Sequence, residues 1–450
     1  MITTHWREMR REFPPMLRMA VPLALAELGW MAMGVVDIVM AGRLGAAAMG
    51  AGSLATMLFY PIAICGTGLL LGMDALAAQA FGAGKPEDAR RTLANGCWLA
   101  AGLTPLVGLA ILGVIPLLRA AHVQPRVLEL SVPYLKALLW GLPLLLFYSA
   151  FRRYLQAVNV VKPVTFALVT ANLVNLAGNW ALMFGHWGAP AMGLVGSAWS
   201  TSLARGYMAA VLGAAIWWHE RGAGRFPWRP RWALLWRLAS LGLPAALQIL
   251  FEGAVFGLVT VLAARLDEVS LAAHSLAVNV VSTTYMVPLG VSSAAAVRVG
   301  QAIGAKDYDG AATRGWTAML LSGGFMAACG LALWIAPGLI VRLYTTDRAV
   351  LATGALLLRI AAFFELFDGL QVTATGALRG LGDTHTAMLA HLVGYWVVGL
   401  PVAYVLAFPW GWGAAGIWVG LSAALILIGL ILVPAWQRRV GKAIAFPGQQ

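Results

Sequence analysis

Six carboxylate side chains interrupt segments that are otherwise long apolar runs. They are Glu27, Asp37, Asp74, Glu252, Glu365 and Asp368. A carboxylate at the centre of a bilayer costs about 2.5 to 3.5 kcal/mol even on lenient insertion scales, so each one requires a partner or a function. Asp74 falls near the end of its run, where a solvated or loop-capping role is expected. Glu27 is open to a structural hydrogen-bonding role as much as to a functional one.

Asp37 has candidate partners in a polar stripe further along the chain. Asn172, Asn175 and Asn179 recur at i, i+3 and i+7 on one face of a predicted helix, and Thr201 follows in the next helix. A carboxylate with amide and hydroxyl oxygens suits Na⁺ or a hydrogen-bonded proton carrier. The alternative is that the stripe only holds helices together. An acid and amides within one half of the chain favour the functional interpretation.

A second set of polar residues lies in the other half. Glu252 follows Gln248 by one helical turn, and Glu365 and Asp368 are i, i+3 neighbours on another predicted helix. Two carboxylates in one low-dielectric pocket cannot both stay ionised without a cation, so the set predicts uptake of a proton or a metal ion. Acids and aromatic side chains also attract lipophilic cations by burial, Coulomb attraction and cation–π contact. A purely structural acid pair is the alternative.

The elements that must position these residues are membrane-spanning helices. The hydrophobic fraction is 60% and the charged fraction 11%, against about 25% charged in an ordinary soluble domain. A span needs roughly 20 apolar residues. Such runs fall near 15–41, 47–73, 93–118, 131–157, 163–185, 192–218, 238–264, 271–295, 315–341, 351–377, 385–408 and 412–436. The composition therefore predicts an all-α integral membrane protein with twelve transmembrane helices.

The two halves of the chain are a tandem repeat. At a shift of 222 residues, Pro22 falls on Pro244 and Gln79 falls on Gln301. Six spans per half return the chain to its starting side, so the repeats are parallel and are related by a pseudo-two-fold axis along the membrane normal. We expect an N-terminal lobe at 1–218, a basic cytoplasmic linker at 219–237 and a C-terminal lobe at 238–450. Such repeats commonly place a substrate site between two lobes of a secondary transporter.

Charge gives the expected orientation and partners. Most of the 31 Lys and Arg residues lie in alternate loops on one side, which by the positive-inside rule makes both termini cytoplasmic. The net charge of +13 then mostly reflects the basic loops that fix the orientation in the membrane, and it also provides some attraction to anionic lipid. No basic face remains for nucleic acid. The three cysteines show no paired spacing, so we expect neither a disulfide framework nor a structural metal site.

No nucleotide site is expected either. The segment Gly82–Lys85 lacks the P-loop pattern, because position 79 is Gln and Pro86 follows the lysine. Transport without ATP requires an ion gradient, and we expect no cofactor other than H⁺ or Na⁺ as the coupling ion. Small residues such as Gly68 and Gly72 are expected to let helices pack closely. We expect the chain to act as a monomer.

Four segments carry a resemblance to a known family. They are VDIVMAG at 36–42, QAFGAG at 79–84, FDGLQ at 367–371 and GALRGLGDT at 376–384. With them the chain resembles, nearly end to end, the multidrug and toxic compound extrusion (MATE) family, and most closely its NorM-like bacterial branch. The resemblance implies a two-lobe exporter that exchanges H⁺ or Na⁺ for organic cations by alternating access.

The resemblance also implies site residues. It would place one coupling site at Asp37, Asn175, Asn179 and Thr201 in the first lobe and one at Glu252 and Asp368 in the second. From the residues themselves we add Gln248 and Phe364 to the second site, with Glu27, Glu365 and Asn172 as further candidates. NorM-like relatives often carry Tyr where this chain has Phe364, which removes an oxygen ligand for Na⁺. Glu27 and Glu365 are extra acids that could serve protons. The pattern therefore favours H⁺ over Na⁺.

The expected function is that of a secondary active multidrug efflux antiporter in the bacterial inner (plasma) membrane. An alternative with the same fold is a flippase or exporter of a lipid-linked or metabolite substrate, for which a strongly basic cavity would be expected. An intramembrane enzyme is a third class. The sequence has neither HExxH nor GxSxG, so we expect no enzymatic activity.

Overall fold

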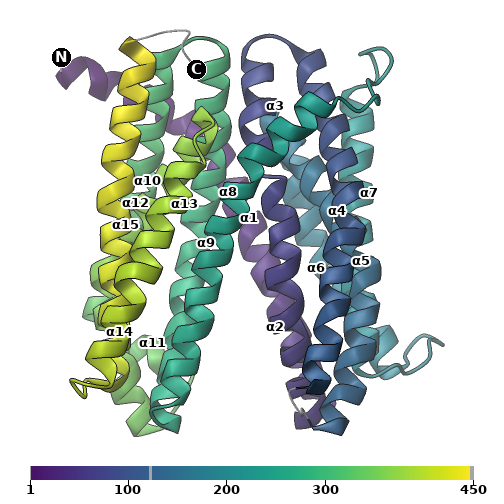
Figure 1. Cartoon of the computed structure of the whole chain (residues 1–450), viewed down its shortest axis with the longest axis vertical. Coiled ribbons are helices and arrows are strands. Elements are labelled where there is room, and N and C mark those ends of the chain that lie inside the picture. The colour runs from purple at the N-terminus through teal and green to yellow at the C-terminus, as the bar shows by residue number, and fades with distance from the viewer. Residues whose placement is uncertain (1, 121–123, 446–450) are drawn as a thin grey trace. The chain divides into compact units, whose positions relative to one another are not determined.

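The computed structural model describes residues 2–120 and 124–445, and these residues form helices without strands (Figure 1). The helices of the first half are α1 (Ile2–Gly42), α2 (Ala46–Leu69), α3 (Gly72–Gly82), α4 (Pro86–Ala120), α5 (Pro125–Ala157), α6 (Lys162–Phe184) and α7 (Leu194–His219). Those of the second half are α8 (Trp232–Ala264), α9 (Glu268–Gly304), α10 (Tyr308–Ile335), α11 (Pro337–Arg342), α12 (Arg348–Leu381), α13 (His385–His391), the π-helix η1 (Leu392–Gly399), α14 (Leu400–Ala407) and α15 (Gly413–Ala445).

Eleven helical segments of the described chain are long and apolar enough to cross a membrane. Two of them combine consecutive elements, α2 with α3 and α13 with η1 and α14. The remaining predicted span corresponds to α7, which is 26 residues long but carries Ser197, Ser200, Thr201, Ser202 and Arg205. These polar side chains lower the mean hydropathy of α7, so this helix is not among the eleven apolar segments. The prediction of an all-α, multi-pass membrane protein is confirmed.

The ends of the helices follow from local sequence. Asp267, Asp307 and Asp347 are N-caps whose carboxylates accept hydrogen bonds from the first backbone N–H groups of α9, α10 and α12. Gly185 and Gly382 adopt left-handed conformations that end α6 and α12. These residues fix where α9, α10 and α12 begin and where α6 and α12 end.

The described helices form two compact units. We call residues 25–246 the first unit and residues 1–24 with 247–450 the second unit. In the first unit α5 packs against α2, α4 and α7, and α6 packs against α7. In the second unit α12 packs against α9, α10 and α15 (Figure 1). These limits differ from the lobes expected at 1–218 and 238–450, because they fall inside α1 and α8 and leave the linker 219–237 within the first unit.

Close backbone contacts explain the shifted limits. A Cβ atom added to Gly68 would lie 2.7 Å from the Cα of Ala246, so the start of α8 belongs with α2. A Cβ added to Gly290 would lie 2.5 Å from the Cα of Ala24, so the start of α1 belongs with α9. The two contacts are equivalent in the repeat, since 290 − 68 = 222 and 246 − 24 = 222. The expected close packing at Gly68 is confirmed, and Gly72 similarly approaches the carbonyl oxygen of Leu238.

Within the second unit, the start of α1 and the end of α15 lie at the same end (Figure 1). The Glu12 carboxylate of α1 forms an ion pair with Arg298, near the end of α9. This arrangement agrees with an even number of crossings between the two described chain ends. The cytoplasmic location of that end stays a prediction.

The packing of α12 against α9 gives a stability prediction. A Cβ on Gly376 would lie 2.2 Å from the carbonyl oxygen of Ser292, whereas a Cβ on Gly324 of α10 would meet nothing within 4 Å. Gly376→Ala should therefore destabilise the protein by about 1–3 kcal/mol through overpacking. Gly324→Ala should be neutral or stabilise by up to about 1 kcal/mol through helix propensity. Thermal unfolding of the purified variants in detergent checks this, and equal midpoints for the two would contradict the close approach.

Candidate functional site

Four side chains converge on the Asp37 carboxylate in the first unit. The amide nitrogens of Asn179 and Asn175 on α6 donate to its Oδ1 atom at 2.7 and 3.1 Å. On α7, the Thr201 hydroxyl donates to Oδ2 at 2.9 Å and the Ser197 hydroxyl to Oδ1 at 3.4 Å. The structure thus brings together the residues that the sequence assigned to one site, and adds Ser197.

Helical spacing and a close contact between α6 and α7 produce this convergence. Asn175 and Asn179 are one turn apart and fully buried. A Cβ added to Gly178 would lie 2.5 Å from the Ser200 hydroxyl, which itself donates to the carbonyl oxygen of Asn175 at 2.7 Å. The small residue at 178 therefore lets α7 approach closely enough for its hydroxyls to reach Asp37.

Asn172, predicted as a further member of this site, is not brought to Asp37. Its amide nitrogen donates to the carbonyl oxygens of Gly29 at 3.0 Å and Leu168 at 2.9 Å. Asn172 therefore holds α6 against α1, which is the structural role considered for the stripe.

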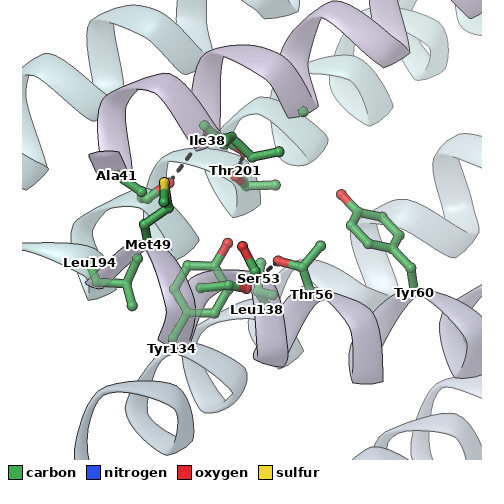
Figure 2. A pocket seen from close by; sticks show the side chains of 14 residues that line it. Ile38, Ala41, Met49, Ser53, Thr56, Tyr60, Tyr134, Leu138, Leu194 and Thr201 are labelled. Carbon is green, nitrogen blue, oxygen red and sulfur yellow. Dashed lines mark hydrogen bonds between the residues drawn. The ribbon is translucent and has the colours of Figure 1, made fainter. Parts of the chain in front are cut away.

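Asp37 lines a cavity of about 230 Å³ within the first unit. Figure 2 shows the hydroxyl groups of Ser53, Tyr60 and Tyr134 turned toward the same space. The lining residues are Gly34, Asp37, Ile38, Ala41, Met49, Gly52, Ser53, Thr56, Tyr60, Tyr134, Leu138, Leu194, Ser197 and Thr201. Asp37 is the one charged residue among them. A single acid in a mostly apolar, tyrosine-containing wall suits a lipophilic cation.

Arg205 lies behind this cavity wall, one turn after Thr201 on α7. It is 1% exposed, and its guanidinium carbon lies 5.0 Å from the ring centre of Phe59 and 6.0 Å from that of Tyr60. Within the described residues its two terminal nitrogens have no hydrogen-bond partner. Its charge interacts electrostatically with Asp37. No role was predicted for this arginine from the sequence, although its i+4 spacing from Thr201 is a signal.

Two other acids of the first unit are paired with arginines. Glu27 forms an ion pair with Arg152 of α5. Asp74 is 1% exposed and lies 3.3 Å from a terminal nitrogen of Arg153. The expected solvated role of Asp74 is therefore wrong, because the adjacent arginine makes its burial tolerable. For Glu27 the structure supplies the structural partner that the sequence left open.

The second unit gathers a different polar cluster around Glu252. The amide nitrogen of Gln248 lies 3.4 Å from Glu252 Oε2, and the Tyr285 hydroxyl is also hydrogen-bonded to that carboxylate. His391 is fully buried, with its Nε2 atom 3.4 Å from the Gln248 amide and 3.9 Å from Glu252 Oε2. The His391 Nδ1 atom lies 2.8 Å from the carbonyl oxygen of Ala387. A proton on Nδ1 leaves Nε2 free to accept from Gln248.

The α12 acids lie beside this cluster. Asp368 is 4% exposed, accepts a hydrogen bond from the Gln371 amide at 3.0 Å, and interacts electrostatically with Glu252. Glu365 is fully buried, and the Thr284 hydroxyl lies 3.3 Å from both of its carboxylate oxygens. Glu252, Glu365 and Asp368 therefore all point into the second unit, as predicted for the acids of α8 and α12.

Phe364, predicted as a site residue, belongs to the apolar core. It is 1% exposed and its ring stacks on that of Trp418 at a centroid distance of 6.1 Å. The indole nitrogen of Trp418 in turn donates to His274. Phe364 therefore packs α12 against α15 and supplies no polar atom to the neighbouring acids.

Sequence reasoning missed His391, Tyr285 and Gln371. Gln371 stands three residues after Asp368, so helical spacing could have identified it. His391 is an ionisable residue inside a span, which is itself a functional signal. It directly precedes the π-helix η1, whose wider turn is frequent at functional sites. Within the described part of the chain, no three His, Cys, Asp or Glu residues form a group that could hold a metal ion.

The Glu27–Arg152 pair gives a second stability prediction. Glu27→Leu should destabilise the protein by about 3–5 kcal/mol, because it leaves a buried arginine without a counter-charge. The double variant Glu27→Leu/Arg152→Met should recover most of that loss, since neither charge is then buried. Thermal unfolding midpoints of the three proteins in detergent measure the effect. A single variant as stable as the parent would show that the pair does not form.

Comparison with known proteins agrees with the repeat and the fold. The MatE family model matches residues 22–181 and 244–405, and the two starts differ by 244 − 22 = 222. A probable multidrug resistance protein NorM from Mesorhizobium japonicum is 35% identical over 96% of this chain and 94% of its own length. The multidrug resistance protein PmpM of Pseudomonas aeruginosa is 33% identical over 95% of this chain and 93% of its own.

Solved structures show the same architecture. The crystal structure of a eukaryotic MATE transporter superposes with a TM-score of 0.86 at 20% identity, covering 97% of this chain and 99% of that one. The matched family model covers both repeats, and the bacterial relatives extend over nearly the whole length. The chain therefore belongs to the MatE family of transporters, in its NorM-like branch.

Proposed function

We propose that the chain is a secondary active multidrug efflux antiporter of the bacterial inner membrane. It exports organic, mostly cationic lipophilic compounds in exchange for a coupling cation by alternating access. It acts as a monomer, with both termini cytoplasmic and no bound cofactor. The observation that carries the proposal is the Asp37 carboxylate, which lines an apolar cavity, is held by uncharged donors, and forms no ion pair within the described chain.

The donor geometry favours H⁺ as the ion taken up at Asp37. All four of its polar neighbours donate hydrogen bonds to the carboxylate. A proton can bind the carboxylate once one of these donors gives way, whereas Na⁺ requires several oxygen ligands directed at the ion and the two amides present nitrogen instead. The amide oxygen of Asn175 is already accepting from Asn179. Na⁺ is the alternative coupling ion, and it would require both amides to turn.

Proton uptake at Asp37 would change the packing around the cavity. A protonated carboxyl accepts hydrogen bonds more weakly than a carboxylate, so the contacts that join α1 to α6 and α7 would loosen. A cationic substrate in the cavity relies on the same negative charge. Proton and drug therefore compete for Asp37, and this competition is the physical basis of exchange. No lining residue is basic, which argues against a pyrophosphate-bearing cargo.

The Glu252–Asp368 cluster supplies a second set of acids for coupling. Glu252 and Asp368 interact in a buried environment where two ionised carboxylates repel each other strongly. His391 and Gln248 stand next to Glu252 and can exchange hydrogen-bond roles with it. We assign to this cluster a proton that the two acids share.

Asp37→Asn should abolish gradient-driven transport with little loss of stability. The amide keeps the shape of the side chain but cannot carry the charge that binds a proton or a cationic drug. In proteoliposomes, efflux of ethidium under an imposed pH gradient should fall at least tenfold, where one pH unit supplies about 1.4 kcal/mol per proton. An imposed Na⁺ gradient forms the second arm and tests the alternative ion.

The matched control for Asp37→Asn is Asp309→Asn, which removes an exposed carboxylate from the first turn of α10. It should transport like the parent. Parent-like efflux by Asp37→Asn would remove the basis of the proposed function.

Glu252→Gln and Asp368→Asn test the second unit separately. If the two acids share one proton, each variant should impair pH-driven efflux, and the double variant should be little worse than either single one. Initial efflux rates from the same proteoliposomes measure this. Unchanged export by both single variants would confine coupling to Asp37.

A further inference from the structure

The segment that follows α7 is fixed against α4 as an ordered strap. The Trp98 indole nitrogen donates to the carbonyl oxygen of Trp228 at 2.7 Å, and the backbone N–H of Arg231 donates to the Asn95 side chain at 2.8 Å. Arg90 donates to the carbonyl oxygen of Ala223. These contacts all lie within the first unit, so residues 220–231 form a wall over the ends of α4, α5 and α7.

The acid of this strap is already neutralised. Glu220 accepts a hydrogen bond from the Tyr154 hydroxyl at 2.5 Å and lies 3.5 Å from a terminal nitrogen of Arg90. The side chains of Arg90 and Glu220 are 11% and 15% exposed, so the pair is largely removed from solvent. Residues 220–231 contain no other acid and four arginines, namely Arg221, Arg225, Arg229 and Arg231. The strap therefore presents a surplus of positive charge.

A cavity of about 410 Å³ lies beneath the strap. Leu93, Phe151 and Ile216 give it an apolar floor, while Arg90 and Arg221 stand with Trp217, Phe226 and Trp228 in its lining. The volume falls within the roughly 300–1,000 Å³ typical of small-molecule sites. The cavity therefore joins apolar helix surface to a basic and aromatic rim.

At the rim of the cavity, the guanidinium group of Arg221 can donate hydrogen bonds to a further partner. Arg221 is exposed, and its guanidinium carbon stacks 4.0 and 3.8 Å from the ring centres of Trp217 and Trp218. Stacking fixes the plane of a guanidinium group but leaves its edge free for an anion. Arg90 is already paired with Glu220, which lines the same cavity. The edge of the Arg221 guanidinium group is suited to a phosphate oxygen.

We propose that this cavity binds an anionic phospholipid from the surrounding leaflet. The lipid phosphate would be held by Arg221, and the start of an acyl chain would lie along Leu93, Phe151 and Ile216. The apolar floor and the exposed tryptophans at the ends of membrane spans favour a lipid over a free anion, because a hydrophilic anion gains nothing from either. The site stands apart from Asp37 and needs no transport activity to be detected.

The test uses the full chain, delipidated in detergent, and measures its thermal unfolding midpoint. Didecanoyl phosphatidylglycerol should raise the midpoint by about 2 °C or more at saturation, since a ligand that binds only the folded state stabilises it. Didecanoyl phosphatidylcholine, which has the same chains and no net charge, should raise it less. Glycerol phosphate, which has the anion without the chains, should have no effect.

Arg221→Gln should weaken the phosphatidylglycerol effect, requiring about tenfold more lipid for half of the shift. Arg229→Gln is the matched control, because it removes the same charge from the same strap outside the cavity and should respond like the parent. Both residues are exposed, so both variants should fold with parent-like midpoints in the absence of lipid. Equal shifts with the two phospholipids, an equal loss in both variants, or a full shift with glycerol phosphate would each overturn the proposal.

Discussion

The cost of placing a carboxylate inside a membrane governs how each acid of this protein is arranged. Glu27 and Asp74 are neutralised by adjacent arginines, and both thereby become structural. Asp37 instead receives four uncharged donors and borders a cavity, which is why we propose that its charge binds a mobile cation. Among the described residues, Glu252 and Asp368 have amide, hydroxyl and imidazole neighbours in place of an arginine, which is why we propose that these two acids share a proton. The distinction between structural and functional acids is therefore one of partner type.

The duplication preserved the fold while the chemistry of its two copies diverged. At a shift of 222 residues, Asp37 corresponds to Val259 and Glu252 corresponds to Trp30, so neither acid has a counterpart in the other repeat. The glycine contacts that shape the backbone are nonetheless repeated. Close backbone approach is a packing requirement that both copies share, whereas the buried acids differ between them.

Much of the fold and of the Asp37 site followed from the sequence, because helical periodicity and burial cost act over short stretches of chain. The Asn175–Asn179 spacing and the apolar surroundings of Asp37 were sufficient to predict their meeting. The pairing of Glu27 with Arg152 could not be predicted in this way. The two residues lie 125 positions apart on different helices, and many other arginines were available as partners. His391 was missed because its partner Gln248 lies 143 residues away on another helix. Asn172 shares the face of its neighbours, but it lies about 10 Å along the helix from Asn179, at the level of Gly29, whose carbonyl oxygen it contacts.

The chain passes from one unit to the other inside α1 and again inside α8. This continuity bears on how the two repeats came to form a single chain. The opening helical segment of each repeat packs into the unit that is built mainly by the other repeat. The contacts that hold it there are the equivalent pairs Gly68–Ala246 and Gly290–Ala24. In a pair of single-repeat chains the same contacts would be a domain swap between identical subunits. Neither copy closes its core alone, so a cut in the linker would sever a loop without yielding two self-sufficient domains.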